Sequence, residues 1–300
     1  MPARPRKTGA PVPGPDVRGG GTLFVVATPI GNLGDVTLRS LEVLRAVPLI
    51  AAEDTRISKR LLGRYEIDTR TTSFHARSGP ERMEELLAHL RGGADLALVT
   101  DAGTPVVSDP GGELVGAWAV AGGRVVPIPG ASAVLAAVAA SGIAGPRWGF
   151  EGFLPRSGRE RGERLARLAS DDRATILFEA PTRVGATLRD LAAACGPERR
   201  AVVCRELTKL HEQIARGTLA ELVAAVADGS IPARGEVAIV VAGHVADETA
   251  DIESRPPIAD ARSRVASLIR AGASRTDAAR QIAAETGHAR RDLYRESDSS

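Results

Sequence analysis

The stretch TLFVVATPIGNLGD (residues 22–35) joins an apolar, β-branched run to a loop that contains two glycines. The run Thr22–Ala27 predicts a buried strand, and residues 37–46 after the loop have helical periodicity. Gly31 and Gly34 allow the backbone to turn sharply and to approach a ligand closely. A strand, a glycine-bearing loop and a helix in this order are typical of an α/β fold.

The same alternation continues along the chain. Strand-like runs occur at 49–52, 96–100, 124–127, 174–178, 201–204 and 237–242. Helical patterns begin near Arg56 and cover 81–91, 113–121, 132–141, 158–169, 182–194 and 218–227. We predict a mostly parallel first sheet with helices on both faces, followed by a second sheet with some antiparallel pairing.

Changes in amino-acid composition along the sequence divide the chain into five segments. We expect a disordered basic tail at 1–20, an α/β domain at 21–145 and a second α/β domain at 146–244. The boundary falls in GPRWGFEGFL (145–154), which holds three of the nine aromatic residues. A polar stretch ending in two prolines predicts a linker at 245–257, and 258–296 reads as a small helical, helix-turn-helix-like appendage.

Composition excludes several classes of protein. Hydrophobic residues make up 43% of the 300 residues, yet no apolar stretch reaches the roughly 20 residues of a membrane helix. The basic start lacks the apolar core of a secretory signal, so we expect a cytoplasmic protein. Cys195 and Cys204 lack metal-ligand spacing and the five histidines are scattered, so we expect no metal.

The charge distribution permits a nucleic-acid partner without requiring one. The formal net charge is only +2, but residues 255–300 hold nine Arg against six Asp or Glu. The Arg-rich segment 262–291 suits phosphate contacts, and a solvated helical face is the equal alternative.

Three glycine-bearing or polar loops follow predicted strands of the first domain: TPIGNLGD, then DAGTP (101–105) with SDPG (108–111), then PIPGASA (127–133). Ligands of open α/β sheets bind at the carboxyl ends of the strands, so we expect these loops to converge on one site. The chain has no G-x-G-x-x-G fingerprint and no Walker lysine, which gives a dehydrogenase or kinase little support.

Eight motifs carry a resemblance to a known family. They occur in the order TPIGNLGD (28–35), AEDTR (52–56), TDAGTPVVSDPG (100–111), PIPGASA (127–133), EGFLPR (151–156), FEAPTR (178–183), RELTK (205–209) and RGEVAIVVAG (234–243). Together they resemble the bacterial 16S ribosomal RNA cytidine 2′-O-methyltransferase family of the tetrapyrrole-methylase-like superfamily. The similarity spans about residues 22–244.

The resemblance implies two α/β domains with S-adenosylmethionine in the cleft between them, and a homodimer. It also implies 2′-O-methylation of a cytidine ribose in the decoding region of the small-subunit RNA. The superfamily's cofactor positions fall on Asp101, Gly103, Thr104, Val107, Ser132, Ala133, Phe178, Glu179, Leu207, Glu236, Val237 and Ala238.

Two positions depart from the family pattern. Thr182 stands where the family commonly has His, which puts an essential imidazole there in doubt. Arg234 stands where it commonly has Lys, which keeps the charge but changes how it binds.

The candidates for a base that removes the hydroxyl proton are Asp54, Asp101, Glu179 and Glu206. Asp54 is the leading candidate for base or substrate orientation, with a helix cap as its alternative role. For Asp101 we favour a structural and cofactor role over that of base.

Candidate RNA contacts are Arg56, Arg183, Arg205 and Lys209, with ordinary surface charge as the alternative for each. Trp148, Phe150 and Phe153 have the ring chemistry to stack a flipped base, although core packing is the stronger expectation.

Three functions remain in competition on the sequence. The first is a ribosomal RNA 2′-O-methyltransferase. The second is a small-molecule methyltransferase acting on a tetrapyrrole, against which TPIGNLGD replaces the shorter Gly-Pro-Gly-Asp loop of those enzymes. The third is a cofactor-sensing RNA-binding protein without activity, which the intact loops disfavour.

Overall fold

The computed structural model describes residues 19–245 and 256–294. The chain divides into two compact units, with the boundary in the sequence between His244 and Val245. The predicted tail at 1–20 and linker at 245–257 lie largely outside the described residues. Each unit is described by itself.

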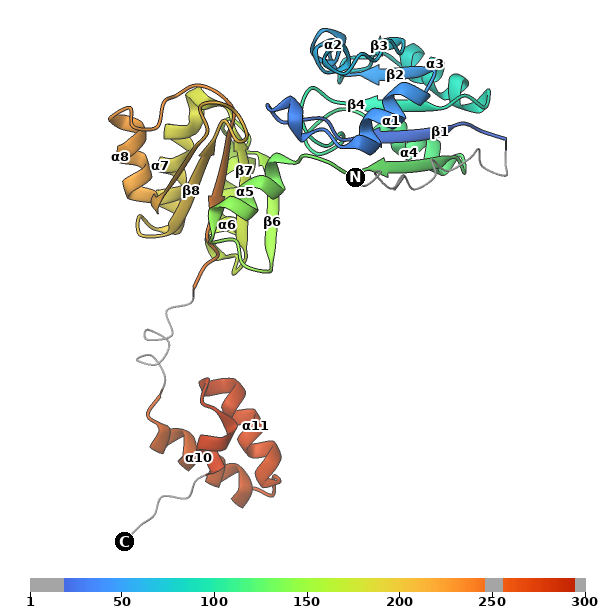
Figure 1. Ribbon diagram of the computed structural model, residues 1–300. Helices are drawn as coiled ribbons and strands as arrows, with labels where there is room; N and C mark the ends of the chain where they lie inside the picture. The colour runs from blue at the N-terminus through green and yellow to red at the C-terminus, as the bar shows by residue number, and fades with distance from the viewer. Residues whose placement is uncertain (1–18, 246–255, 295–300) are drawn as a thin grey trace, which may run out of the picture. The chain divides into compact units, whose positions relative to one another are not determined.

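The first unit contains a parallel five-stranded sheet of order β3-β2-β4-β1-β5 (Figure 1). Its strands are β1 (Thr22–Val26), β2 (Leu49–Ala52), β3 (Thr71–Ser73), β4 (Leu96–Val99) and β5 (Arg124–Ile128). Its helices are α1 (Leu38–Ala46), α2 (Thr55–Arg64), α3 (Pro80–Arg91) and α4 (Gly112–Val120), with a short 3-10 turn η1 (Leu33–Asp35). The predicted parallel sheet is confirmed.

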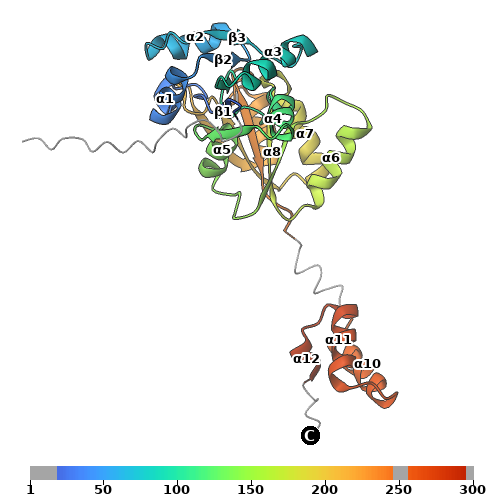
Figure 2. The same cartoon turned by 90° about the vertical axis from the view of Figure 1, so that its right-hand side faces the viewer.

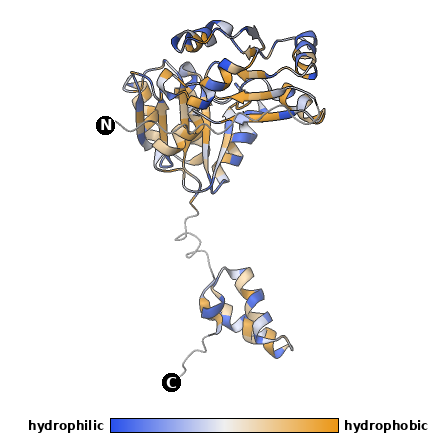
Figure 3. Cartoon of the chain, turned by 45° about the vertical axis from the view of Figure 1, so that its right-hand side comes forward, coloured by the Kyte–Doolittle hydropathy of each residue, from blue (hydrophilic) through white to orange (hydrophobic). Residues whose placement is uncertain are grey.

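Alternation along the strands places a hydrophobic core on each face of this sheet. Phe24 and Val26 of β1 pack with α1 and α2, whereas Leu23 packs with α3 and α4. All three side chains are buried. The helices therefore cover both faces, as a strand that is apolar on both sides requires. Figure 3 shows that the strands are predominantly hydrophobic and that the helices carry both hydrophobic and hydrophilic residues.

The second sheet has the order β6-β7-β10-β8-β9. Its strands are β6 (Trp148–Phe153), β7 (Ala174–Glu179), β8 (Arg200–Arg205), β9 (Gln213–Thr218) and β10 (Val237–Val241). β10 pairs antiparallel with both β7 and β8, and β8 with β9, whereas β6 and β7 are parallel. The expected antiparallel pairing is confirmed.

Helices also cover both faces of the second sheet (Figure 2). One face carries α6 (Arg159–Ser170), the turn η2 (Pro181–Arg183), α7 (Val184–Cys195) and α8 (Leu219–Ala227). The other carries α5 (Ala133–Ser141), which follows the first sheet in sequence but packs on the second. Ile30 of the TPIGNLGD loop belongs to this same core. The loop and α5 therefore join the two halves of the unit.

The second unit is a small helical body made of α10 (Ile258–Arg270), α11 (Arg275–Thr286) and α12 (Arg290–Tyr294). Its core holds Ala261, Val265, Ala278, Ala279, Ile282 and Leu293. Ser274 caps α11, and Gly287 ends that helix in the left-handed conformation. Within the described residues, no helix is both long and apolar enough to cross a membrane.

Candidate functional site

Three loops meet at the carboxyl edge of the first sheet. Thr28 and Gly103 exchange backbone hydrogen bonds of 2.8 and 3.0 Å, which join the loops after β1 and β4. Thr104 Oγ1 donates to the carbonyl of Ala131 at 3.3 Å, which adds the loop after β5. The convergence expected from the sequence is therefore present, and its geometry is fixed by the main chain.

A cavity of about 400 Å³ lies between these loops and the second sheet. Every position that the resemblance assigned to the cofactor lines it, except Asp101. The walls include Ile30, Gly103, Thr104, Val107, Asp109, Ser132, Ala133, Phe178, Glu179, Leu207, Glu236, Val237 and Ala238. One wall is apolar and another carries hydroxyls and carboxylates, the mixture typical of sites for small polar cofactors.

The loop after β4 holds unusual backbone conformations. Val106 and Ser108 have φ of 76° and 64°, in the left-handed region that disfavours side chains with a Cβ. Gly103 also has positive φ, and a Cβ there would lie 3.3 Å from Ile30 Cγ2. Strained residues of this kind persist where the surrounding structure imposes them, and they cluster at functional sites.

A second cavity of about 390 Å³ adjoins the first and shares Ile30, Ala102 and Glu236 with it. Its walls come from the TPIGN segment, α2 and the end of β4, together with Lys209. Asp101 lines this second cavity rather than the first. The aromatic residues lie elsewhere: Trp148 and Phe150 pack on the second core, and Phe153 lines the first cavity at 5.7 Å from the ring of Phe178.

Several carboxylates lie close together near the two cavities. Asp101 Oδ1 accepts the Asp54 N–H at 3.0 Å, and Glu53 Oε2 accepts the Thr100 hydroxyl at 2.6 Å. Burial, and then the charge of Glu53, raise the pKa of Asp101. The same two causes raise the pKa of Asp109 to about 6. Perturbed carboxyl groups beside a cavity are typical of catalytic sites.

Asp109 was not predicted as a site residue, although it stands in the motif TDAGTPVVSDPG (100–111). It lines the first cavity, close enough to Glu53 and Asp101 to feel their charge. No spacing rule reveals this, because Glu53 follows β2 whereas Asp101 and Asp109 follow β4, and the raised pKa depends on burial.

Asp54 acts as a helix cap in this structure. Its carboxylate accepts the Arg56 N–H at 2.8 Å and Arg56 Nη2 at 2.6 Å. These bonds lower the pKa of Asp54 to about 2. Asp54 lines neither cavity, so the geometry favours the alternative role and leaves its role as a base a prediction.

The predicted RNA contacts do not form one surface. Arg56 is exposed but paired with Asp54, whereas Arg205 is only 7% exposed and donates to Gln213 Oε1 and the His211 carbonyl. Arg205 therefore stabilises the β8–β9 hairpin and faces little solvent. Lys209 bridges Glu206 and Glu236 at 2.8 and 3.0 Å and lines the second cavity. Lys209 also lowers the pKa of Glu206, which makes Glu206 a partner of that ammonium rather than a base.

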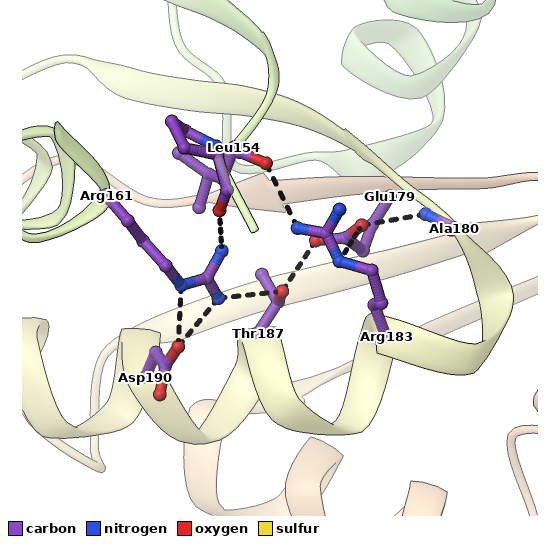
Figure 4. A network of polar contacts seen from close by, with 8 residues as sticks. Leu154, Arg161, Glu179, Ala180, Arg183, Thr187 and Asp190 are labelled. Carbon is purple, nitrogen blue, oxygen red and sulfur yellow. Dashed lines mark hydrogen bonds and ion pairs between the residues drawn. The ribbon is translucent and has the colours of Figure 1, made fainter. Parts of the chain in front are cut away.

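A buried polar network supports the cavity wall at Glu179 (Figure 4). The Glu179 side chain is fully buried, and its carboxylate accepts Thr187 Oγ1 at 2.6 Å and the Ala180 N–H at 2.8 Å. Arg183 Nε lies 3.3 Å from Glu179, and its Nη2 donates to the Leu154 carbonyl. With its oxygens so engaged, Glu179 fixes the backbone of the wall rather than serving as a base.

The network continues through Arg161 into α6. Arg161 donates to Thr187 Oγ1 at 3.1 Å and pairs with Asp190 at 2.6 Å. Thr187 thus accepts from one charged group and donates to another, which joins EGFLPR and FEAPTR through α7. Thr182, in the turn beside Arg183, is exposed and lines neither cavity.

Cys204 lines the first cavity, but burial raises the pKa of its thiol to about 11. Among residues 19–245 and 256–294, no cluster of His, Cys, Asp and Glu is arranged to hold a metal ion.

Comparison with known proteins agrees with this site. The model of the tetrapyrrole (corrin/porphyrin) methylases matches residues 22–223. A ribosomal RNA small subunit methyltransferase I from Synechocystis sp. is 48% identical over 276 residues, which cover 91% of this chain and 96% of that protein.

Solved structures resemble the chain in fold. A cobalt precorrin-4 methyltransferase superposes with a TM-score of 0.58 at 20% identity and covers 74% of this chain and 94% of its own. A uroporphyrin-III C-methyltransferase from Thermus thermophilus, in complex with S-adenosyl homocysteine, superposes with a TM-score of 0.54 at 18% identity over 74% and 97% of the two chains.

Proposed function

The chain belongs to the tetrapyrrole methylase family, and from that premise we propose that it methylates the 2′-hydroxyl of a cytidine in the decoding region of 16S ribosomal RNA. The observation that carries the proposal is the 48% identity to a ribosomal RNA small subunit methyltransferase I over nearly its whole length. The two adjoining cavities support it, because methyl transfer needs a cofactor and an acceptor side by side.

The first cavity fits S-adenosylmethionine. Its volume of about 400 Å³ lies in the range of small-molecule sites. Phe178, Leu207 and Val237 offer apolar contact to an adenosyl group. Thr104, Ser132 and Glu236 offer hydroxyl and carboxylate partners for ribose and amino groups. When bound, the cofactor supplies a methyl group on a positively charged sulfur, which is already an activated donor.

The residues of the chain then act mainly by positioning. A rigid wall that holds the acceptor oxygen in line with the methyl group can supply roughly 7–11 kcal/mol of barrier reduction. The strained loop at Val106 and Ser108 and the network at Glu179 provide such rigidity.

One proton must leave the acceptor hydroxyl as the new carbon–oxygen bond forms. Asp101 lines the second cavity and carries a raised pKa, which suits a group that accepts this proton. We assign Asp101 this role and Asp109 the role of a neighbouring charge in the first cavity.

The RNA contacts are proposed from charge and exposure. Lys209 lines the second cavity, and Arg56 lies on α2, the helix that also lines this cavity. Arg183 pairs with Glu179 in the wall of the first cavity. The Arg-rich helices of the second unit add further phosphate contacts. We also propose a homodimer in the bacterial cytoplasm, testable by sedimentation of the purified protein.

Radiolabelled S-adenosylmethionine tests the function directly. The protein is incubated with 30S particles, naked small-subunit RNA or a precorrin. We expect label in a cytidine ribose of the RNA. Label in the precorrin alone would instead support the small-molecule alternative, and no transfer to any acceptor would support a binding protein without activity.

A further inference from the structure

The second cavity has three properties that no described interaction explains. Ser58 lines it, is only 7% exposed, and its hydroxyl has no hydrogen-bond partner. A buried hydroxyl without a partner costs free energy, so its retention indicates a group that arrives from outside. The cavity thus contains a polar position that the folded chain leaves unsatisfied.

The rim of the cavity joins apolar surface to positive charge. Leu33 and Ile57 line it and are 38% and 39% exposed, so both side chains offer apolar surface at the mouth of the cavity. Arg60 also lines it, is exposed, and makes no ion pair or hydrogen bond within the described part of the chain. Flat apolar contact beside an unpaired guanidinium matches a nucleobase with its phosphate.

The walls of the cavity are held open by specific contacts. Tyr65 Oη donates to the Leu33 carbonyl at 2.8 Å, which fixes the TPIGNLGD loop to the end of α2. On the other side Gly31, with φ of 147°, lies against the stem of Lys209, where a Cβ would come within 2.3 Å of Cγ. The opening is therefore part of the fold and not a gap between loose loops.

From these observations we propose that the second cavity receives the target nucleotide, swung out of the RNA, with Ser58 bonding the nucleotide and Arg60 holding its phosphate. The inference rests on the proposed function and adds the place where the acceptor enters. Ile30, Ala102 and Glu236 line both cavities, so the acceptor and the cofactor would meet at this shared wall.

Two substitutions in the full-length protein test the proposal. Ser58→Val fills the cavity without adding charge, and Arg60→Gln removes the cation at its mouth. Lys59→Gln is the matched control, because Lys59 is an exposed cation on the same helix that does not line the cavity. Thermal melting and the Kd for S-adenosylmethionine verify that each variant folds and binds cofactor.

We expect Ser58→Val and Arg60→Gln each to raise the KM for small-subunit RNA by about tenfold or more, with the cofactor Kd unchanged. Arg60→Gln also lowers the slope of log K against log salt for RNA binding by about one, whereas Lys59→Gln changes neither quantity. An RNA with a fluorescent cytidine analogue at the target position reports unstacking on binding, and Ser58→Val abolishes that signal.

The results distinguish the proposed function from the assignment of the second cavity to the target nucleotide. If the wild-type protein labels no small-subunit RNA, the proposed function and the cavity assignment both fall. If the wild-type protein labels the RNA and neither substitution changes KM or the fluorescence signal, only the cavity assignment is overturned. Arg60 is exposed, so its variant decides the matter even if Ser58→Val does not fold.

Discussion

Asp109 shows how burial and neighbouring charge set the chemistry of a single residue. Its raised pKa of about 6 means that the folded state disfavours the carboxylate relative to the unfolded chain, whose reference value is 3.8. Between those values the folded protein binds more protons than the unfolded one, so stability rises as the pH falls through 6. Above pH 6 the Asp109 carboxylate is charged in the folded protein, and its full unfavourable effect on stability is present.

Asp109→Asn therefore raises the melting temperature at pH 7.5, and the difference from the wild type disappears as the pH approaches 4. Scanning calorimetry between pH 4 and 8 measures this. Asp171→Asn is the control with opposite sign, because Arg173 holds the pKa of Asp171 at about 2. A melting temperature of Asp109→Asn below that of the wild type at pH 7.5 would contradict the argument.

Gly31→Ala tests the contact between the TPIGNLGD loop and the second half of the unit. The added Cβ would lie within 2.3 Å of Lys209 Cγ, and the positive φ disfavours alanine in any case. We expect the KM for RNA to rise more than the cofactor Kd. Gly31→Ala combined with Lys209→Ala removes the clash but not the backbone strain, so its partial recovery in a double-mutant cycle separates the two effects.

Residue types at the site were partly predictable from the sequence. The small residues that approach a ligand, such as Gly103 and Ser132, stand in recognisable motifs after strands. Ser58 and Asp109 were not predictable, because a missing partner or a raised pKa arises only when distant segments pack together.

At the scale of elements, the strands that sequence patterns missed are edge strands. β3 is a short polar strand and β9 is largely polar, and β6 was interpreted as a domain boundary because of its aromatics and glycines. β6 also carries an irregular register near Gly152, whose φ is 62°. Edge strands are buried on fewer sides, so the continuous apolar run that reveals β4 or β10 is absent from them.

The network of Figure 4 joins α6 to α7, and its stability can be measured. Arg161→Ala leaves Thr187 and the half-exposed Asp190 without the guanidinium, so we expect the free energy of unfolding to fall by about 2 kcal/mol. Arg159→Ala, which removes an exposed pair with Glu163 on the same helix, leaves it close to unchanged. Urea titration of both variants gives the values, and equal losses would show that the buried network adds nothing.

Helix caps near and far from the cavity form a second matched pair. Ser132 caps α5 at the first cavity, and Thr218 caps α8 in a capping box with Glu221. Each alanine substitution costs about 1 kcal/mol of stability. We expect only Ser132→Ala to weaken S-adenosylmethionine binding by calorimetry; comparable weakening by Thr218→Ala would attribute the effect to general destabilisation.

At the scale of the whole molecule, the two cavities and the Arg-rich helices belong to different units of the chain. Both cavities lie within residues 28–238, and the second unit has a core of its own. Removal of residues 246–300 is therefore expected to leave cofactor affinity unchanged and to weaken RNA binding by about tenfold at moderate salt, with a smaller salt slope. Filter binding and calorimetry on the shortened chain measure the two affinities. Equal loss of both would refute this division of labour.

The wall of Ile30, Ala102 and Glu236 has a consequence for turnover. Because these residues border both occupants, the affinity of each can depend on the other, and the linkage is reciprocal: RNA changes the cofactor affinity by the same factor as the cofactor changes the RNA affinity. The methylated particle and the spent cofactor then leave as coupled products. If RNA binding tightens the cofactor, the departure of either product loosens the other, and the order in which the two products leave can then set the rate of turnover.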